Sequence, residues 1–208
     1  GHAARIYRNY GNASIGVVRE NPYRLATDIA GIGFVTADKI AQKLGFAKDS
    51  ALRAEAGILY VLHELTDEGH VYYPYESLIE KCQEMIEIDR EVVVKAVAAL
   101  AEDKRIIIED LNRGGAFEEN HKAIYLAGYH AAETQLAARL KTLIGAPRAL
   151  RQMAAEKAVA WVQEKLSLTL AERQIEAIRC LADHKVMVIT GGPGTGKTTL
   201  INALLRIC

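Results

Sequence analysis

Hydrophobic residues recur at helical spacing along most of this chain, and short extended runs interrupt them in only a few places. Near the amino end, Asn21 and Pro22 are typical of a helix start and precede a predicted helix over residues 23–29. A second helix is predicted over 36–44, and Gly45 follows it where many helices end in a left-handed residue. A glycine turn joins the two helices, which are predicted to share a small core of Leu25, Ile29, Ile32, Ile40 and Leu44.

The middle of the chain has a different order of elements. A long helix that begins near Leu52 is predicted to end at Gly69, and a short extended segment follows it. Two amphipathic helices come next, the second with Asp89 as its expected N-cap, and then two strands joined by a glycine-containing loop. This order predicts a winged helix whose later segments are 71–74, 76–86, 90–103, 105–109, 112–115 and 123–126.

The last third of the chain is predicted to be helical around one short hydrophobic run. The expected helices are 129–143, 151–166, 171–183 and 200–207. Thr169 and Glu172 are expected to form a capping box for the third of these helices. The run 186–190 contains several β-branched residues and predicts a buried parallel strand. One side of the second helix is expected to bury Met153, Ala154, Val159, Trp161 and Val162.

Composition and charge indicate a modular globular chain. Half of the 208 residues are hydrophobic and a quarter are charged, which excludes a disordered, collagen-like or disulfide-scaffold protein. The net charge of zero argues against a nucleic-acid binder when the chain is taken whole. However, the formal charge is +3 over residues 1–50, −8 over 51–128 and +5 over 129–208. We therefore expect DNA to contact the two ends of the chain and to avoid its middle.

Structural zinc and membrane contact are not expected. Cys82, Cys180 and Cys208 form no CxxC or Cys/His pairing, which predicts reduced thiols in a cytoplasmic protein. His63 and His70 lie at a helical interval but have no third ligand nearby, so packing or surface histidines are favoured over a metal site. No run approaches ~18 uninterrupted apolar residues, the length that a membrane span requires.

The glycine turn Gly31-Ile32-Gly33 and its two helices resemble the helix-hairpin-helix module, which grips the DNA backbone. Glycines let the main chain approach a phosphate closely, and the amides that open the second helix point outward as anion donors. Lys39 and Lys43, one helical turn apart, add electrostatic attraction. Such contacts position DNA without reading its sequence. The alternative is a helical scaffold in which the glycines only make the turn.

The winged helix lacks the charge of a DNA reader. In DNA-binding winged helices the third helix enters the major groove. Here that helix, residues 91–103, has Lys95 as its only internal cation and lies in the acidic segment. Because phosphates would be repelled, we favour a spacer or a contact surface for a protein partner.

A phosphate-binding motif follows the hydrophobic run. The sequence fulfils GxxxxGK[ST], between a predicted strand and a predicted helix as the motif requires. Backbone amides would bind the phosphates of ATP, Lys197 would neutralise the β- and γ-oxygens, and the Thr198 hydroxyl would be a Mg²⁺ ligand. AAA-type ATPases, helicases and small kinases all use such loops. The predicted ATP-binding residues of the loop are Gly191, Gly192, Gly194, Thr195, Gly196, Lys197, Thr198 and Thr199.

Gln174 favours one of these classes. It lies one helix upstream of the run, where superfamily-one helicases place a glutamine that binds the adenine edge, although a lone helical glutamine is usually solvated. Together these features resemble the RecD/TraA family of DNA helicases, in particular RecD-like members with an extended N-terminal region. The segments that carry the resemblance are 6–11, 20–25, 31–38 and 191–199.

The resemblance implies ATP-dependent 5′ to 3′ translocation along single-stranded DNA, with single-stranded or forked DNA as the partner in recombination and repair. Related proteins are sometimes named exodeoxyribonuclease V alpha subunits, but no set of carboxylates here has the spacing of a nuclease site. The competing hypothesis is a DNA- or protein-binding platform attached to an AAA-type P-loop ATPase.

The chain is expected to be part of a longer protein, because its first residues look like the trailing helix of another hairpin unit and it ends shortly after Lys197. The acid pair and second RecA-like domain that the resemblance implies would lie beyond Cys208. The chain alone is therefore expected to be catalytically inactive. The run 186–190, without parallel neighbours, is expected to favour self-association.

These arguments together predict a mainly α fold: a helix-hairpin-helix and a winged-helix-like module with a small β wing, followed by the truncated start of a RecA-like α/β P-loop domain. The predicted segments are a helix-hairpin-helix region 1–50, a winged-helix-like module 51–128, a helical linker 129–168 and a P-loop region 169–208.

Overall fold

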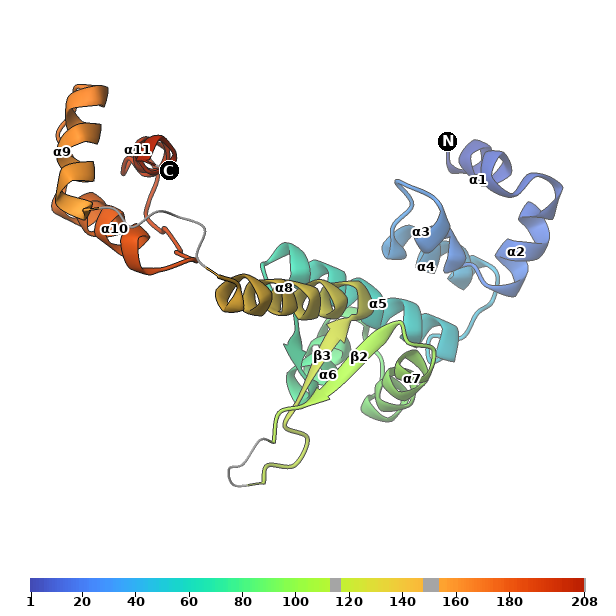
Figure 1. Ribbon diagram of the computed structural model, residues 1–208. Coiled ribbons are helices and arrows are strands. Elements are labelled where there is room, and N and C mark those ends of the chain that lie inside the picture. Colours follow the sequence, from blue (N-terminus) through green and yellow to red (C-terminus); the bar gives the residue numbers. More distant parts are fainter. Residues whose placement is uncertain (113–116, 148–153, 208) are drawn as a thin grey trace. The chain divides into compact units, whose positions relative to one another are not determined.

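The computed structural model describes residues 1–112, 117–147 and 154–207. The chain divides into two compact units, Gly1–Glu133 and Thr134–Cys208. Each unit has its own hydrophobic core, and helices dominate both (Figure 1). The mainly helical fold with a small sheet is confirmed, whereas the finer division into four segments stays a prediction.

Short helices open the first unit. They are α1 (His2–Tyr10), the 3₁₀ helix η1 (Gly11–Ala13), α2 (Ser14–Glu20), α3 (Arg24–Asp28) and α4 (Phe34–Lys43). The prediction that Asn21 is the N-cap of α3 is wrong, because Tyr23, two residues later, holds that position. The Asn21 side chain accepts a hydrogen bond from the amide of Tyr23 at 3.0 Å. Asn21 therefore stabilises the turn before the helix, and α3 begins only at Arg24.

The predicted glycine end of α4 is confirmed. Gly45 has φ +84°, and the amide of Phe46 donates to the carbonyl of Ala41 at 3.1 Å. This hydrogen bond folds the chain back at the helix end and brings Phe46 against the core. Leu44 is exposed, so the prediction that it joins the core is wrong, since the cap buries the residue after the glycine in its place.

The winged helix follows in the expected order. Its elements are α5 (Ala51–Asp67), β1 (Tyr73–Pro74), α6 (Tyr75–Ile86), α7 (Arg90–Glu102), β2 (Ile106–Asp110) and β3 (Lys122–Leu126). The three strands form an antiparallel sheet in the order β1-β3-β2, with Ile108 opposite Ile124. Asp89 stands at the N-cap of α7 as predicted, although its side chain makes no capping hydrogen bond.

One core runs through the whole first unit. Leu25, Ile32 and Phe34 from the hairpin region belong to the same cluster of buried residues as Ile58 and Val97 from the winged helix. The two modules recognised in the sequence are therefore packed as a single body, with α5 in contact with α4, α6 and α7.

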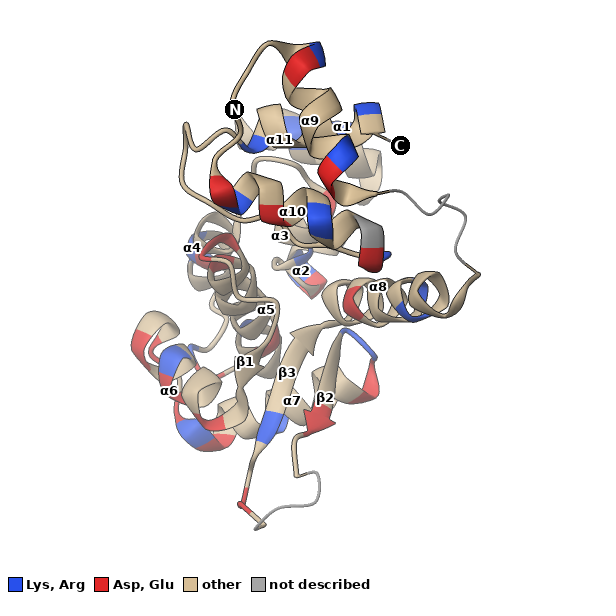
Figure 2. Cartoon of the chain, turned by 60° about the vertical axis from the view of Figure 1, so that its left-hand side comes forward, with Lys and Arg blue, Asp and Glu red and all other residues tan. Residues whose placement is uncertain are grey.

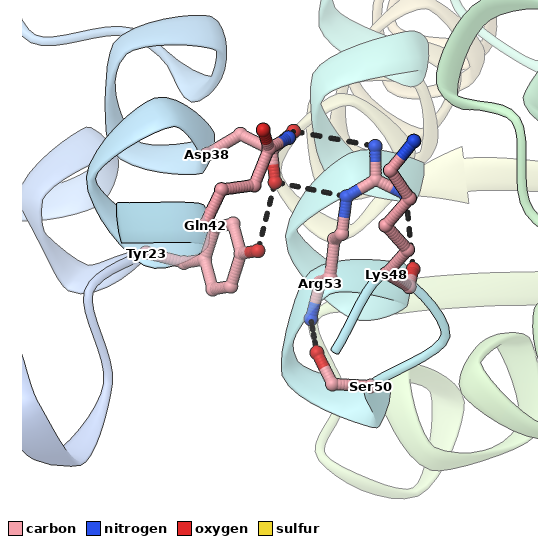
Figure 3. Close-up of polar contacts among 6 residues, drawn as sticks. All are labelled: Tyr23, Asp38, Gln42, Lys48, Ser50 and Arg53. Atoms are coloured by element: carbon pink, nitrogen blue, oxygen red, sulfur yellow. Dashed lines mark hydrogen bonds and ion pairs between the residues drawn. The ribbon is translucent and has the colours of Figure 1, made fainter. Parts of the chain in front are cut away.

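A buried ion pair also joins α4 to α5 (Figure 3). Arg53 donates through Nε to Asp38 Oδ1 at 2.8 Å and through Nη2 to Oδ2 at 3.2 Å. The Tyr23 hydroxyl and the Gln42 amide complete the set of donors to this carboxylate, at 2.9 and 3.1 Å. Burial, together with Asp38, raises the pKa of Tyr23 well above its usual range. Every polar atom of the carboxylate is thus hydrogen bonded inside the protein.

Cys82 lies fully buried in α6, and desolvation raises the pKa of its thiol to about 12. We expect iodoacetamide at neutral pH to alkylate the partly exposed Cys180 in the folded chain but to spare Cys82, because the thiolate is the reactive form. Peptide mass spectrometry would measure the two rates, and unfolding in guanidinium provides the control in which both react. Equal rates in the folded chain would contradict the burial of Cys82.

Helix α8 (Ala127–Gly145) leads from the first unit into the second, which also contains α9 (Ala155–Leu166), α10 (Glu172–Asp183) and α11 (Lys197–Ile207). Val159 and Val162 are buried in its core as predicted. Trp161 is 46% exposed and Ala154 is also exposed, so those two predictions are wrong. The buried side of α9 is formed by Ala158, Val159 and Val162, and Trp161 lies outside it. Met153 lies outside the described residues.

Two other predictions for the second unit are wrong. Ala171 rather than Thr169 is the N-cap of α10, because the Gln174 side chain accepts a hydrogen bond from the amide of Ala171 at 2.9 Å. Residues 186–190 do not form a strand: the sheet in the described part of the chain has only β1, β2 and β3. Ile189 packs on the core of the second unit, but Val188 is 82% exposed. No strand lies beside this segment in the described residues, so its backbone has no ladder to join.

Candidate nucleotide and DNA-binding sites

The predicted phosphate-binding loop connects the irregular segment 186–190 to the first turn of α11. Gly194 and Gly196 have φ +76° and +79°, in the left-handed region that strains residues with a side chain. These two glycines therefore allow the chain to turn sharply directly before α11. Leu200 is the first residue of this helix whose amide bonds back, to the carbonyl of Gly196 at 2.9 Å. The amides before it are available to an anion, as at other helix starts.

Gln174 lies against this loop. A Cβ at Gly196 would come within 2.7 Å of Gln174 Nε2, so a side chain at that position would displace the amide. The oxygen of the same side-chain amide accepts a hydrogen bond from the backbone amide of Ala171, at the start of α10. Tertiary packing thus brings together the upstream glutamine and the glycine loop, two predicted site features that are far apart in the sequence.

Lys197 is the first residue of α11, and its ammonium group turns back onto the loop. Its Nζ donates to the carbonyls of Gly191 and Gly192 at 2.7 and 2.5 Å, and Thr195 Oγ1 donates to Gly192 at 2.8 Å. Thr198 and Thr199 are exposed at the start of the helix. The ammonium group of Lys197 therefore lies inside the turn of the loop, which also contains the unbonded backbone amides before Leu200. This arrangement fits the phosphates of a nucleotide, with the Thr198 hydroxyl accessible to a metal ion.

The glycine turn of the first unit exposes its backbone. Gly31 has φ +83°, and its carbonyl accepts a hydrogen bond from Arg5 Nη1 at 3.5 Å. Gly33 is exposed and is the N-cap of α4. Ile32 is buried between the two glycines and its amide donates to the carbonyl of Ile29 at 3.1 Å, so the exposed main chain of the turn is that of Gly31 and Gly33. The turn thus has one side chain, that of Ile32, in the core and two exposed glycines on either side of it.

Cations lie on two helices beside this turn. Lys39 and Lys43 are exposed on the same side of α4, as the sequence predicts. Arg5 of α1 was not among the predicted site residues. It is brought to the turn because α1 is hydrogen bonded to α3, through Asn9 to the carbonyl of Asp28 at 3.1 Å and through Tyr10 to the Asp28 carboxylate at 2.7 Å. No local sequence signal indicates this long-range contact.

The winged helix keeps its acidic character in the folded chain. Acidic residues, red in Figure 2, are prominent on α6. Two of the cations of this module are engaged by its own acids: Arg90 with Glu76 at 2.7 Å and Lys81 with Glu84 at 3.2 Å. His70 packs edge-on against Tyr73, with ring centroids 5.5 Å apart. Within the described residues, no helix is both long and apolar enough to span a membrane.

Comparison with known proteins connects these two sites. Residues 1–72 match the family model of the ATP-dependent RecD2 DNA helicase HHH domain, and residues 174–208 match the model of an AAA domain. The chain is 31% identical over 205 residues to the ATP-dependent RecD2 DNA helicase of Deinococcus radiodurans; the match covers 97% of this chain and 28% of that protein. The glycine turn lies in the first matched region and the phosphate-binding loop in the second, which confirms that the chain is RecD-like, with a RecD2-type helix-hairpin-helix domain.

Proposed function

We propose that this chain is part of an ATP-dependent DNA helicase of the RecD type. The observation that carries the proposal is the phosphate-binding loop, where Lys197, the free amides of α11 and Gln174 meet. The likeness to a RecD2 helicase along nearly the whole chain supports it. Because the chain spans less than a third of that relative, helicase activity is proposed for the whole protein.

In the proposed nucleotide site, ATP supplies the free energy that drives movement. Lys197 exchanges its two carbonyl acceptors for the β- and γ-phosphates, which are charged and therefore stronger acceptors. The amides of Gly194, Gly196 and the first turn of α11 hold the same phosphates. Thr198 contributes its hydroxyl to Mg²⁺, and Gln174 orients the base.

In the proposed DNA site, the backbone of the glycine turn and the ammonium groups of Lys39 and Lys43 contact phosphates without reading bases. The substrate is single-stranded or forked DNA, the direction of movement is 5′ to 3′, and the protein acts in the cytoplasm in recombination or repair. The acidic winged helix is proposed to contact a protein partner.

Substitution of Lys197 tests the proposed motor in the full-length protein. We expect Lys197→Ala to abolish ATP-dependent unwinding of a duplex with a 5′ single-stranded tail, because the main cationic contact to the transferred phosphate is lost. DNA binding without ATP should not change. The matched control is Lys165→Ala, an exposed lysine of α9 outside the loop.

A strand-displacement assay on 5′-tailed and 3′-tailed duplexes would measure both rate and direction. Unwinding by Lys197→Ala at the wild-type rate would contradict the assignment of the loop. ATP hydrolysis by the wild type without any strand separation would favour the competing proposal, a DNA- or protein-binding platform on an AAA-type ATPase.

A further inference from the structure

A groove of about 830 Å³ lies within the first unit, between the hairpin region and the winged helix. Residues of α3 and the start of α4 form one side, α5 contributes a helical face, and the junction of β3 with α8 forms the other side. Neither the nucleotide-binding loop nor the lysines of α4 take part in it. Its lining includes Gly33, Phe34, Tyr60, His63, Arg105 and Tyr129.

Aromatic rings form much of one wall. Tyr23 stacks on Phe34 with ring centroids 5.9 Å apart and an interplanar angle of 19°, and Phe34 stacks on Tyr60 at 5.1 Å and 16°. All three rings line the groove, and Tyr60 at the end of the column is only partly buried. Tyr129 lines the opposite side and is 38% exposed. Tyr23 and Phe34 are buried and stack within the column, so the rings that can present a surface to a ligand are those of Tyr60 and Tyr129. Flat apolar surfaces of this kind suit the faces of unpaired nucleic-acid bases.

The charge of the lining differs from that of the acidic module around it. Arg24, His63 and Arg105 line the groove, and Glu55 is the single acidic residue among its described lining residues. Desolvation, with a further contribution from Asp103, raises the pKa of Glu55 even though Arg105 opposes the shift. Arginines and partly exposed aromatic rings in one lining are the combination found in sites for single-stranded nucleic acid.

The groove is continuous with the glycine turn, because Gly33 belongs to both. We propose that unpaired bases of a DNA single strand enter this groove while the backbone of the same strand lies on the turn. The inference rests on the proposed DNA-binding function and specifies its substrate as a strand with free bases. A base-paired strand keeps its base faces stacked and would present only phosphates.

The test compares two oligonucleotides of equal length, one of thymidines and one of abasic sites, by fluorescence anisotropy with the 208-residue chain. Both carry the same phosphates, so only base contacts distinguish them. We expect the chain to bind the thymidine strand about fivefold or more tightly, the lower end of what stacking on aromatic side chains contributes. Tyr129→Ala should remove this preference and leave the affinity for the abasic strand unchanged. Tyr72→Ala, a tyrosine of similar exposure outside the groove, should behave as wild type.

A second variant makes the test independent of Tyr129. Glu55→Gln should increase the affinity for the thymidine strand, since it removes the acidic group from the lining. Equal affinity of the wild type for the two strands, or the same preference in Tyr129→Ala and wild type, would overturn the base-binding groove. If Lys39→Glu still weakened binding in that case, the proposed DNA contact of the hairpin would stand. Absence of binding to either strand would overturn both.

Discussion

Replacement of Lys39 and Lys43 together by Glu is expected to lower the affinity of the chain for DNA at least about tenfold. Both lysines are exposed on the side of α4 that continues from the open glycine turn. Each phosphate contact that is lost should also reduce the dependence of log K on log salt by about one unit. Titration of single-stranded, duplex and forked DNA at several salt concentrations would measure both quantities.

The matched control is the double reversal Lys95→Glu and Lys104→Glu. These lysines are also exposed in the first unit, but they belong to the acidic winged helix. Their substitution changes the net charge by the same amount, so it corrects for long-range repulsion of DNA. An equal loss of affinity in the two double variants would show that the hairpin makes no specific contact with phosphates.

Asp38→Ala is expected to destabilise the first unit by about 3–5 kcal/mol, because it leaves the buried guanidinium of Arg53 without its counter-ion. The same change removes the acceptor of Tyr23 and Gln42, so several donors lose their partner at once. Since the ion pair joins α4 to α5, the variant should also loosen the hairpin against the winged helix (Figure 3).

Urea unfolding followed by circular dichroism would measure this loss. Glu84→Ala removes an exposed ion pair with Lys81 and should lower the stability far less than Asp38→Ala, because solvent screens the exposed pair. In the double variant Asp38→Leu and Arg53→Met, both charges are absent, so most of the lost stability should return. A loss of less than about 1 kcal/mol in Asp38→Ala would show that the pair adds nothing to the stability of the unit.

The features that the sequence predicted well depend on local chemistry. The GxxxxGK[ST] motif forms a tight loop before a helix because its glycines reach backbone angles that other residues avoid. Gly45 ends α4 for the same reason. The order of helices and strands in the winged helix also follows from spacing and turn residues along the chain.

The wrong predictions concern a strand that has no neighbour in the fold and the exact ends of helices. The run 186–190 has the composition of a buried strand, but a strand needs a neighbour for its backbone hydrogen bonds. Gln174 was predicted to bind adenine, and in the fold its side chain also accepts from the N-cap amide of α10, the part that Glu172 was expected to play. Ala171 stands at the N-cap in place of Thr169.

The sequence by itself thus determined where the two predicted binding motifs lie, because both depend on residues close together in the chain. Tertiary structure decided how the segments combine. It joined the basic hairpin and the acidic winged helix through one core and the pair Asp38–Arg53. It also placed Arg105, a cation of the acidic segment, in a groove beside the glycine turn. The net charge of −8 is a sum over all of residues 51–128. A bound DNA strand contacts only the side chains that folding brings to one surface.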